Sequence, residues 1–463
     1  MTFVVTTDYE IDKLAAPNLP LAPEQWDRRF QDQYSNVLRL YFNRLDNFIA
    51  RLMANASTLP VSGTVSLPPT YLDAFGRQRV SQPFTLFDSQ NRYAADNQFD
   101  VATTGTGTTS FLSNEAAVKM EVTGAGVGSV TRQSFRSFPY QPGKGLLVLA
   151  TFVMDSSQSL NLTQRVGYYN DQNGVFFQRI DGTYSFVLRS YVTGSVSDAR
   201  TVNQSAWNGD KLDGTGASGY TLDPTKAQIL WMDFEWLGVG SVRCGFIING
   251  EYIVCHTFTN ANEITNVYMT TAILPVRYEI KTVTSAVAAS MKSICCSVVS
   301  EGGFEQTSID HVARRTTVLG SIGTTFLPLV SIRLASGRTG AVVLPNRVQV
   351  LPTTSQNYEV ALIKNPTLTG ATWASTVSSD SNVEFDVAAT ATTGGTIVQT
   401  DYVTSTGSGG TSGTSFAAAY NFDLQLGASI GGTSDIYTVA IRTVSGATTG
   451  DAVGSLSFFD LTQ

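Results

Sequence analysis

The sequence changes character once, near residue 55. Residues 24–54 carry apolar side chains at alternating steps of four and three, a spacing that predicts one amphipathic helix. Almost everything after them consists of short apolar stretches separated by turn-forming residues, which predicts β-strands. We therefore expect a mainly β protein with one N-terminal helix, and its 463 residues leave room for two or three domains.

The apolar positions of the helix follow a heptad pattern, with Leu at one core position and aromatic residues at the other. The six residues are Tyr34, Leu38, Tyr41, Leu45, Phe48 and Leu52. This pattern is typical of helices that pack against copies of themselves in a coiled coil. About three heptads do not fix the number of subunits. The alternative is a helix that folds back on its own β domain.

Composition excludes several classes of function. Charged residues make up 14% of the chain and aromatic residues 10%, with 40 Gly, which fits a turn-rich β protein and not a disordered one. The net charge is −7 and no run of Lys or Arg stands out, so a nucleic-acid partner is not expected. The apolar run 145–154 is too short to cross a bilayer, and residues 1–12 do not resemble a signal peptide.

Two polar stretches rich in Pro or Gly, 55–70 and 301–317, divide the chain. They predict an N-terminal arm and helical stem over residues 1–62, for attachment and oligomerisation. They also predict a central β-sandwich over 63–312 and a C-terminal β domain over 313–463.

Hairpin signals suggest the type of the central domain. Asp181-Gly182 and Asn249-Gly250 each separate two apolar runs, as the turns of two-residue hairpins do. The mixture of alternating and continuously apolar strands favours a sandwich of concanavalin-like or jelly-roll type. Alternation over Tyr420–Leu426 extends the β prediction to a second, C-terminal sandwich.

The second hairpin bears on the cysteines. A two-residue turn at Asn249-Gly250 pairs Ile248 with Glu251 and sets Cys244 opposite Cys255. A disulfide is within reach at that separation. Because no signal peptide is expected, free buried thiols are the favoured interpretation.

Candidate catalytic residues are few. The two histidines, His256 and His311, have no further ligands at metal-binding spacing, so neither a metal nor another cofactor is expected. No nucleophile elbow and no phosphate-binding loop occurs in the sequence.

One strand could carry chemistry. Alternation over residues 231–236 places Trp231, Asp233 and Glu235 on one face and Met232, Phe234 and Trp236 toward the core. The carboxylate pair resembles the catalytic strand of concanavalin-like glycoside hydrolases. That pattern has a further Glu where Trp231 and Met232 stand, so a non-enzymatic protein is expected.

Two interpretations of the Trp231 face remain. In the favoured one, Asp233 and Glu235 accept hydrogen bonds from Arg243, Arg277 or turn amides. In the other, Trp231 stacks on a sugar and the two carboxylates accept from its hydroxyl groups.

Three segments resemble virion proteins of tailed bacteriophages, cyanophages in particular: Tyr34–Phe48, Leu72–Gln90 and Ile229–Ile264, the last continuing to Leu274–Ile280. The resemblance implies a virion structural protein, tail-fibre-like, made in the host cytoplasm. It further implies a homo-oligomer, with a trimer favoured over a dimer, held to other virion proteins by its N-terminal arm. The distal β domains would meet the host surface, whose glycans are a possible partner. The alternatives are a capsid decoration or cement protein and a glycan-binding or glycan-cleaving tailspike.

Overall fold

The structure is a computed structural model of the chain. It describes residues 27–58, 72, 82–124, 126–155, 161–284, 288–305, 308, 310–375, 381–405, 414–417, 422–445 and 449–462. The chain divides into two units, residues 1–67 and 68–463. The arm 1–23 and most of the stretch 55–70 lie outside the described residues.

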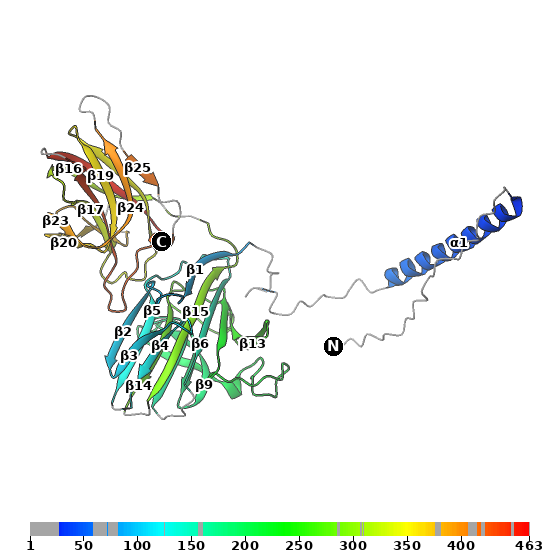
Figure 1. Ribbon diagram of the computed structural model, residues 1–463. Coiled ribbons are helices and arrows are strands. Elements are labelled where there is room, and N and C mark those ends of the chain that lie inside the picture. Colours follow the sequence, from blue (N-terminus) through cyan, green and yellow to red (C-terminus); the bar gives the residue numbers. More distant parts are fainter. Residues whose placement is uncertain are drawn as a thin grey trace. The chain divides into compact units, whose positions relative to one another are not determined.

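The described residues of the first unit form one helix, α1 (Arg28–Thr58), where the sequence predicts 24–54 (Figure 1). The helix begins at Arg28 because Asp27 caps it. The Asp27 carboxylate accepts a hydrogen bond from the Arg29 N–H at 2.8 Å, and its carbonyl accepts from the Gln31 N–H at 3.1 Å. No helix among the described residues is both long and apolar enough to cross a membrane.

The heptad positions form one side of α1. The side chains of Tyr34, Leu38, Tyr41 and Leu45 are half-buried, whereas most of those between them are exposed. The side chains of Phe48 and Leu52 lie outside the described part of the helix. Large apolar residues beside the stripe remain open to solvent: Leu40 and Phe42 are each 55% exposed and Ile49 is 43% exposed. A coiled-coil partner stays a prediction.

The second unit is mainly β, and every strand pair described in it is antiparallel (Figure 1). An eight-stranded sheet contains β1 (Phe84–Gln90), β3 (Gly107–Leu112), β4 (Ala117–Val122), β6 (Leu146–Val153), β11 (Gln228–Phe234), β12 (Val242–Ile248), β13 (Glu251–Phe258) and β15 (Ala289–Ser300). A seven-stranded sheet contains β2 (Phe99–Gly105), β5 (Gly128–Ser134), β7 (Leu162–Tyr169), β8 (Gly174–Ile180), β9 (Thr183–Ser190), β10 (Ser197–Asn203) and β14 (Val276–Thr282). A short 3₁₀ helix, η2 (Gln204–Ala206), follows β10.

These two sheets enclose one apolar core. Alternate residues of the eight-stranded sheet, such as Val148 and Met232, share the core with alternate residues of the seven-stranded sheet, such as Val166 and Tyr278. Met232 and Phe234 face inward, which confirms the predicted alternation of that strand. Both predicted hairpins are present, with β8–β9 joined at Asp181-Gly182 and β12–β13 joined at Asn249-Gly250.

The register of the second hairpin differs from the prediction beyond Gly245. Gly245 pairs with Val254 as expected, but Cys244 then pairs with His256, so Cys255 is the extra residue of a β-bulge. The bulge lies where the Trp231 indole N–H donates to the Ile253 carbonyl at 3.2 Å. Cys244 and Cys255 are both free and buried, as the favoured interpretation had it.

Two further sheets enclose a second core. A four-stranded sheet contains β16 (Asp310–Ile322), β18 (Val343–Pro352), β25 (Thr414–Ala417) and β27 (Gly450–Asp460). A six-stranded sheet contains β17 (Leu327–Leu334), β19 (Asn357–Lys364), β21 (Ala374–Ser375), β22 (Val383–Asp386), β24 (Thr396–Thr404) and β26 (Ile436–Thr443). The short strands β20 (Thr367–Thr369) and β23 (Ala391–Thr393) pair with each other. Val330, Val348, Val360 and Leu456 are among the residues of this core.

Two sequence predictions in this region were wrong. The stretch 301–317 is not all linker, because β16 begins at Asp310 and pairs along β27, so the predicted boundary at 312/313 falls inside a strand. Residues 422–424 form a 3₁₀ helix, η3 (Phe422–Leu424), and not part of a strand. Phe422 turns away from the second core and packs in the first, where its ring lies 5.7 Å from that of Phe84.

We predict that Gly245→Ala destabilises the protein, because a Cβ there would overlap the Ile253 carbonyl oxygen and lie 2.9 Å from the Trp231 indole nitrogen. Overpacking of this kind costs about 2 kcal/mol in the free energy of unfolding, measured by urea denaturation. Gly340→Ala is the control, because a Cβ at Gly340 meets no atom within 4 Å. Equal denaturation midpoints for the two variants would contradict the prediction.

Candidate functional site

Trp231 lies on the outer face of the eight-stranded sheet, as the alternation predicts, but it is covered. The residue is 1% exposed, its ring contacts that of Tyr252 edge-on at 5.5 Å, and it lies beside Gly245 across the strand pair. A stacking platform for sugar needs an open ring face. The structure therefore places Trp231 as a packed side chain.

The two carboxylates of this strand are buried as well. Asp233 is 0% exposed and forms an ion pair with Arg243, one of the partners that the sequence suggested. Glu235 is 1% exposed. The Arg243 guanidinium also donates to the Leu72 carbonyl, so the chain at Leu72 crosses this face. Neither carboxylate is open to a substrate.

Arg277, the other suggested partner, lies elsewhere. It belongs to β14 in the seven-stranded sheet, where Val276, Tyr278 and Ile280 point into the core. The residues that alternate with them, Arg277, Glu279 and Lys281, consequently occupy the opposite, outer face. There β14 pairs with β7, so Arg277 lies opposite Gly167 and Glu279 lies opposite Arg165.

On the outer face of the seven-stranded sheet, a small apolar cluster with two aromatic rings lies beneath the charged side chains. Tyr169, Phe176 and Val187 are each 0% exposed and form a small apolar cluster of their own. Guanidinium groups cover this cluster: Arg165 and Arg189 lie 5.2 and 5.0 Å from the Phe176 ring centroid. Arg277 lies 5.4 Å from that of Tyr169. Cations over ring faces are attracted by the ring quadrupole, which holds these arginines in place.

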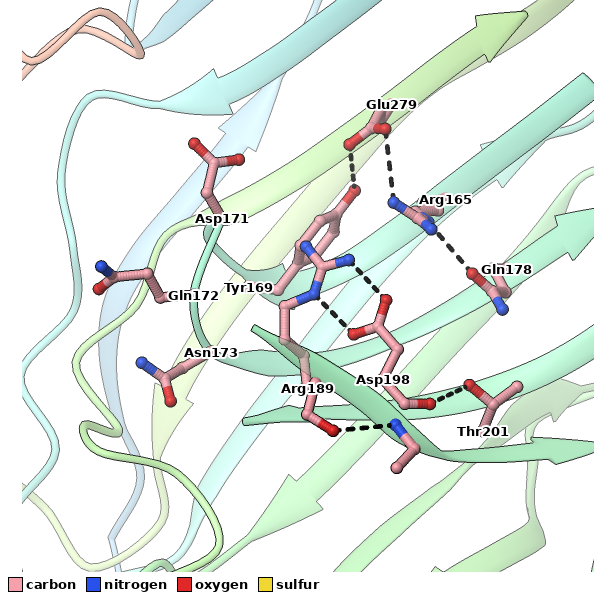
Figure 2. Close-up of polar contacts among 12 residues, drawn as sticks. Arg165, Tyr169, Asp171, Gln172, Asn173, Gln178, Arg189, Asp198, Thr201 and Glu279 are labelled. Carbon is pink, nitrogen blue, oxygen red and sulfur yellow. Dashed lines mark hydrogen bonds and ion pairs between the residues drawn. The ribbon is translucent and has the colours of Figure 1, made fainter. Parts of the chain in front are cut away.

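Glu279 is the anionic centre of the arrangement (Figure 2). Its Oε1 lies 3.6 Å from Arg165 and 3.3 Å from Lys281. Its Oε2 accepts from the Tyr169 hydroxyl at 3.5 Å. Burial and the neighbouring Glu279 charge raise the pKa of Tyr169, so that hydroxyl stays protonated and donates.

Arg189 is fully engaged by Asp198 (Figure 2). Its Nε and Nη2 donate to the two carboxylate oxygens, each at 2.8 Å, in the bidentate geometry that suits a guanidinium. Burial alone would lower the pKa of Arg189, but the hydrogen bond and charge of Asp198, together with Tyr169 and Glu279, outweigh burial and raise that pKa. The Arg189–Asp198 ion pair therefore holds both side chains in fixed positions.

Arg277 is held differently, from the loop between β7 and β8. Its Nη1 donates to Asp171 Oδ1 at 2.6 Å, and the Asp171 side chain is 77% exposed. The loop itself is firmly built: the Asn170 side chain accepts from the Asn173 N–H at 2.8 Å. The buried Asn173 side chain in turn bonds the backbone N–H of Thr270 at 3.0 Å.

Together these residues surround a cavity of about 350 Å³, which we call the arginine hollow. Its lining comprises Ser129, Thr131, Arg165, Asp171, Arg189, Val196, Arg277, Glu279 and Lys281. The arrangement presents charged groups and hydroxyls to a ligand. Among the described residues, no group of three His, Cys, Asp or Glu side chains could hold a metal ion.

The sequence analysis did not identify the hollow. One signal was available: in a chain with 14% charged residues, Arg165, Arg189 and Arg277 each stand directly beside an apolar residue, namely Val166, Leu188 and Val276. That pattern marks arginines on a packed surface, but it does not show that the three strands are neighbours.

No family model matches the chain, and no curated protein matches it. Solved structures similar to this chain include the carbohydrate recognition domain of Emp47p, at 8% identity over 47% of this chain and 97% of that one, with a TM-score of 0.30. A glycosyl hydrolase family 16 protein from Mycobacterium smegmatis matches at 8% identity over 46% and 100%, with a TM-score of 0.30. Peanut lectin matches at 9% identity over 48% and 98%, with a TM-score of 0.26. Likeness of this size does not establish a shared activity, substrate or partner.

His256, beside the bulge, is a buried imidazole base. Its Nδ1 accepts a hydrogen bond from the Asn208 N–H at 3.4 Å, which requires that nitrogen to be unprotonated. Burial, with the nearby charge of Arg200, lowers the pKa of His256 from 6.5 to about 4. The unfolded chain therefore binds more protons than the folded one between these two pH values.

We predict that His256 makes the protein less stable as the pH falls from 6.5 to about 4. In His256→Gln, the loss of unfolding free energy across this window should be smaller than in His311→Gln, which removes the other histidine of the chain. Chemical denaturation at a series of pH values measures both. The same pH dependence in the two variants would refute the assignment.

Proposed function

We propose that this chain is a non-enzymatic structural protein of a tailed-bacteriophage virion, an oligomeric fibre or appendage subunit attached by its N-terminal stem. In this proposal the first sandwich is of concanavalin-like or jelly-roll type. The two β-sandwiches form the part carried outward from the particle.

The observation that carries the proposal is the stripe on α1. Tyr34, Leu38, Tyr41 and Leu45 follow one side of a 31-residue helix, and Leu40 and Phe42 beside them are exposed. A single amphipathic helix gains most of its stability by packing that side against something else. Heptad spacing suits another copy of the same helix, which joins subunits at one end and leaves the β-sandwiches free.

The state of the carboxylates supports a non-enzymatic role. The strand that resembles a glycosidase strand has Asp233 tied to Arg243 and Glu235 buried. In the arginine hollow, Glu279 is surrounded by Arg165, Lys281 and the Tyr169 hydroxyl. Carboxylates held in this way lack the free approach to substrate that an acid–base pair needs.

We predict that Leu38→Asp combined with Leu45→Asp dissociates the oligomer, because both charges would be buried between helices. Mass photometry of the purified full chain should then report monomers. The matched control is Asn36→Asp with Asn43→Asp, which adds the same two charges at the same spacing on exposed positions of α1. An intact oligomer in the Leu double variant would show that the β-sandwiches hold the subunits together.

Attachment to the particle is tested separately. We predict that an antibody to this chain labels the tail or neck in negative-stain micrographs of the phage that carries it. Label confined to the capsid faces would overturn the appendage proposal. It would favour the alternative of a capsid decoration or cement protein.

A further inference from the structure

The arginine hollow has the dimensions and lining of a binding site for a polar molecule. Its volume of about 350 Å³ falls at the lower end of the range for small-molecule sites, about 300 to 1,000 Å³. Val196 is the one apolar side chain among the described residues that line it. A ligand rich in hydroxyl and charged groups fits such a lining, and an apolar ligand does not.

The charges of the hollow favour an anion. Four cationic side chains face three anionic ones there: Arg165, Arg189, Arg277 and Lys281 against Asp171, Asp198 and Glu279. One positive charge is left over, although the whole chain carries a net charge of −7. A local excess of cations on an acidic protein raises the concentration of anions at that place.

Arg277 is the cation best placed to take a ligand. It is 6% exposed, and its buried Nε makes no hydrogen bond among the described residues, lying 3.9 Å from Glu279 Oε2. Its close partner, Asp171, is 77% exposed on a loop. Exposed carboxylates form weak ion pairs, so Asp171 can be displaced at small cost, whereas the buried Arg277 stays in place.

We propose that the arginine hollow binds an acidic saccharide whose carboxylate replaces that of Asp171 on Arg277. The guanidinium then receives a carboxylate in the same position, with a charge-assisted hydrogen bond in place of the one it loses. The hydroxyl groups of Ser129 and Thr131 lie on the lining to bond the sugar hydroxyls. The proposal does not depend on the stem or on a virion setting.

The experiment titrates a galacturonic acid trisaccharide into the full chain by isothermal titration calorimetry. Arg277→Gln should weaken binding at least about tenfold, because the ligand carboxylate loses its cation. Asp171→Asn should bind about fivefold more tightly, because the internal competitor loses its charge, and exposed ion pairs are worth up to about this factor. Thermal denaturation checks that each variant is folded.

The matched control is Arg442→Gln. Arg442 pairs with Glu359 at 2.6 Å and lies 4.5 Å from the Phe326 ring centroid, so like Arg277 it has a carboxylate partner and an aromatic ring beside it, but it is 41% exposed and lies outside the hollow. Its loss should leave binding unchanged. Asp171→Asn keeps the test decisive if Arg277→Gln does not fold, because Asp171 is exposed and its loss is tolerated.

Three outcomes would overturn the proposal. The first is that the trisaccharide binds neither the natural chain nor Asp171→Asn. The second is equal binding of the neutral galactose trisaccharide, which would remove the role of the charge. The third is complete displacement of the sugar by an equal concentration of inorganic sulfate, which would make the hollow a site for free anions.

Discussion

The strict alternation of side chains in β7, β8, β9 and β14 is the constraint on which the functional surface depends. Each inward residue of these strands, such as Val166 or Tyr278, is committed to the core between the two large sheets. Each intervening residue must therefore appear on the outer face, whatever its chemistry. Arg277 and Glu279 of β14 meet Arg165 of β7 there because of the register between the two strands, and a slip of β14 by one residue would send Arg277 and Glu279 into the core.

Buried ion pairs hold charged side chains in place on both large sheets. Removing ions from water is costly, and the attraction between partners repays the cost only with good geometry. The bidentate contact of Arg189 with Asp198 meets that condition, and Arg243 with Asp233 fills the corresponding role on the other large sheet. Aromatic rings beneath the guanidinium groups, such as Phe176 beneath Arg165, support them where carboxylates do not reach. An acidic chain thus keeps a fixed group of cations on one face.

Local chemistry explains which features could be predicted from the sequence. The turns at Asp181-Gly182 and Asn249-Gly250 follow from residues that tolerate positive φ, and both turns have it. The inward side of β11 follows from its alternation. The bulge at Cys255 does not follow from local sequence, because it arises where Gly245 and Trp231 meet. The arginine hollow does not follow from local sequence either, because Tyr169 and Glu279 are in contact although 110 residues separate them in the sequence. Alternation alone predicts that Phe422 lies in a strand of the C-terminal domain. In the structure its ring contacts those of Phe84 and Phe304 at the other core, and the sequence pattern does not show those contacts.

The position of β15 has a consequence for how the protein is made. This strand is the last of the first sandwich in sequence, yet it lies between β6 and β4 and also pairs with β1. While the ribosome is still synthesising residues before 289, β6 and β4 each lack a neighbour, and their unpaired backbone N–H and C=O groups are open to other chains. Folding of the sandwich waits for its final strand, and such non-local closure is slow. A chain that ends before β15 would keep these strand edges exposed, and we expect it to aggregate.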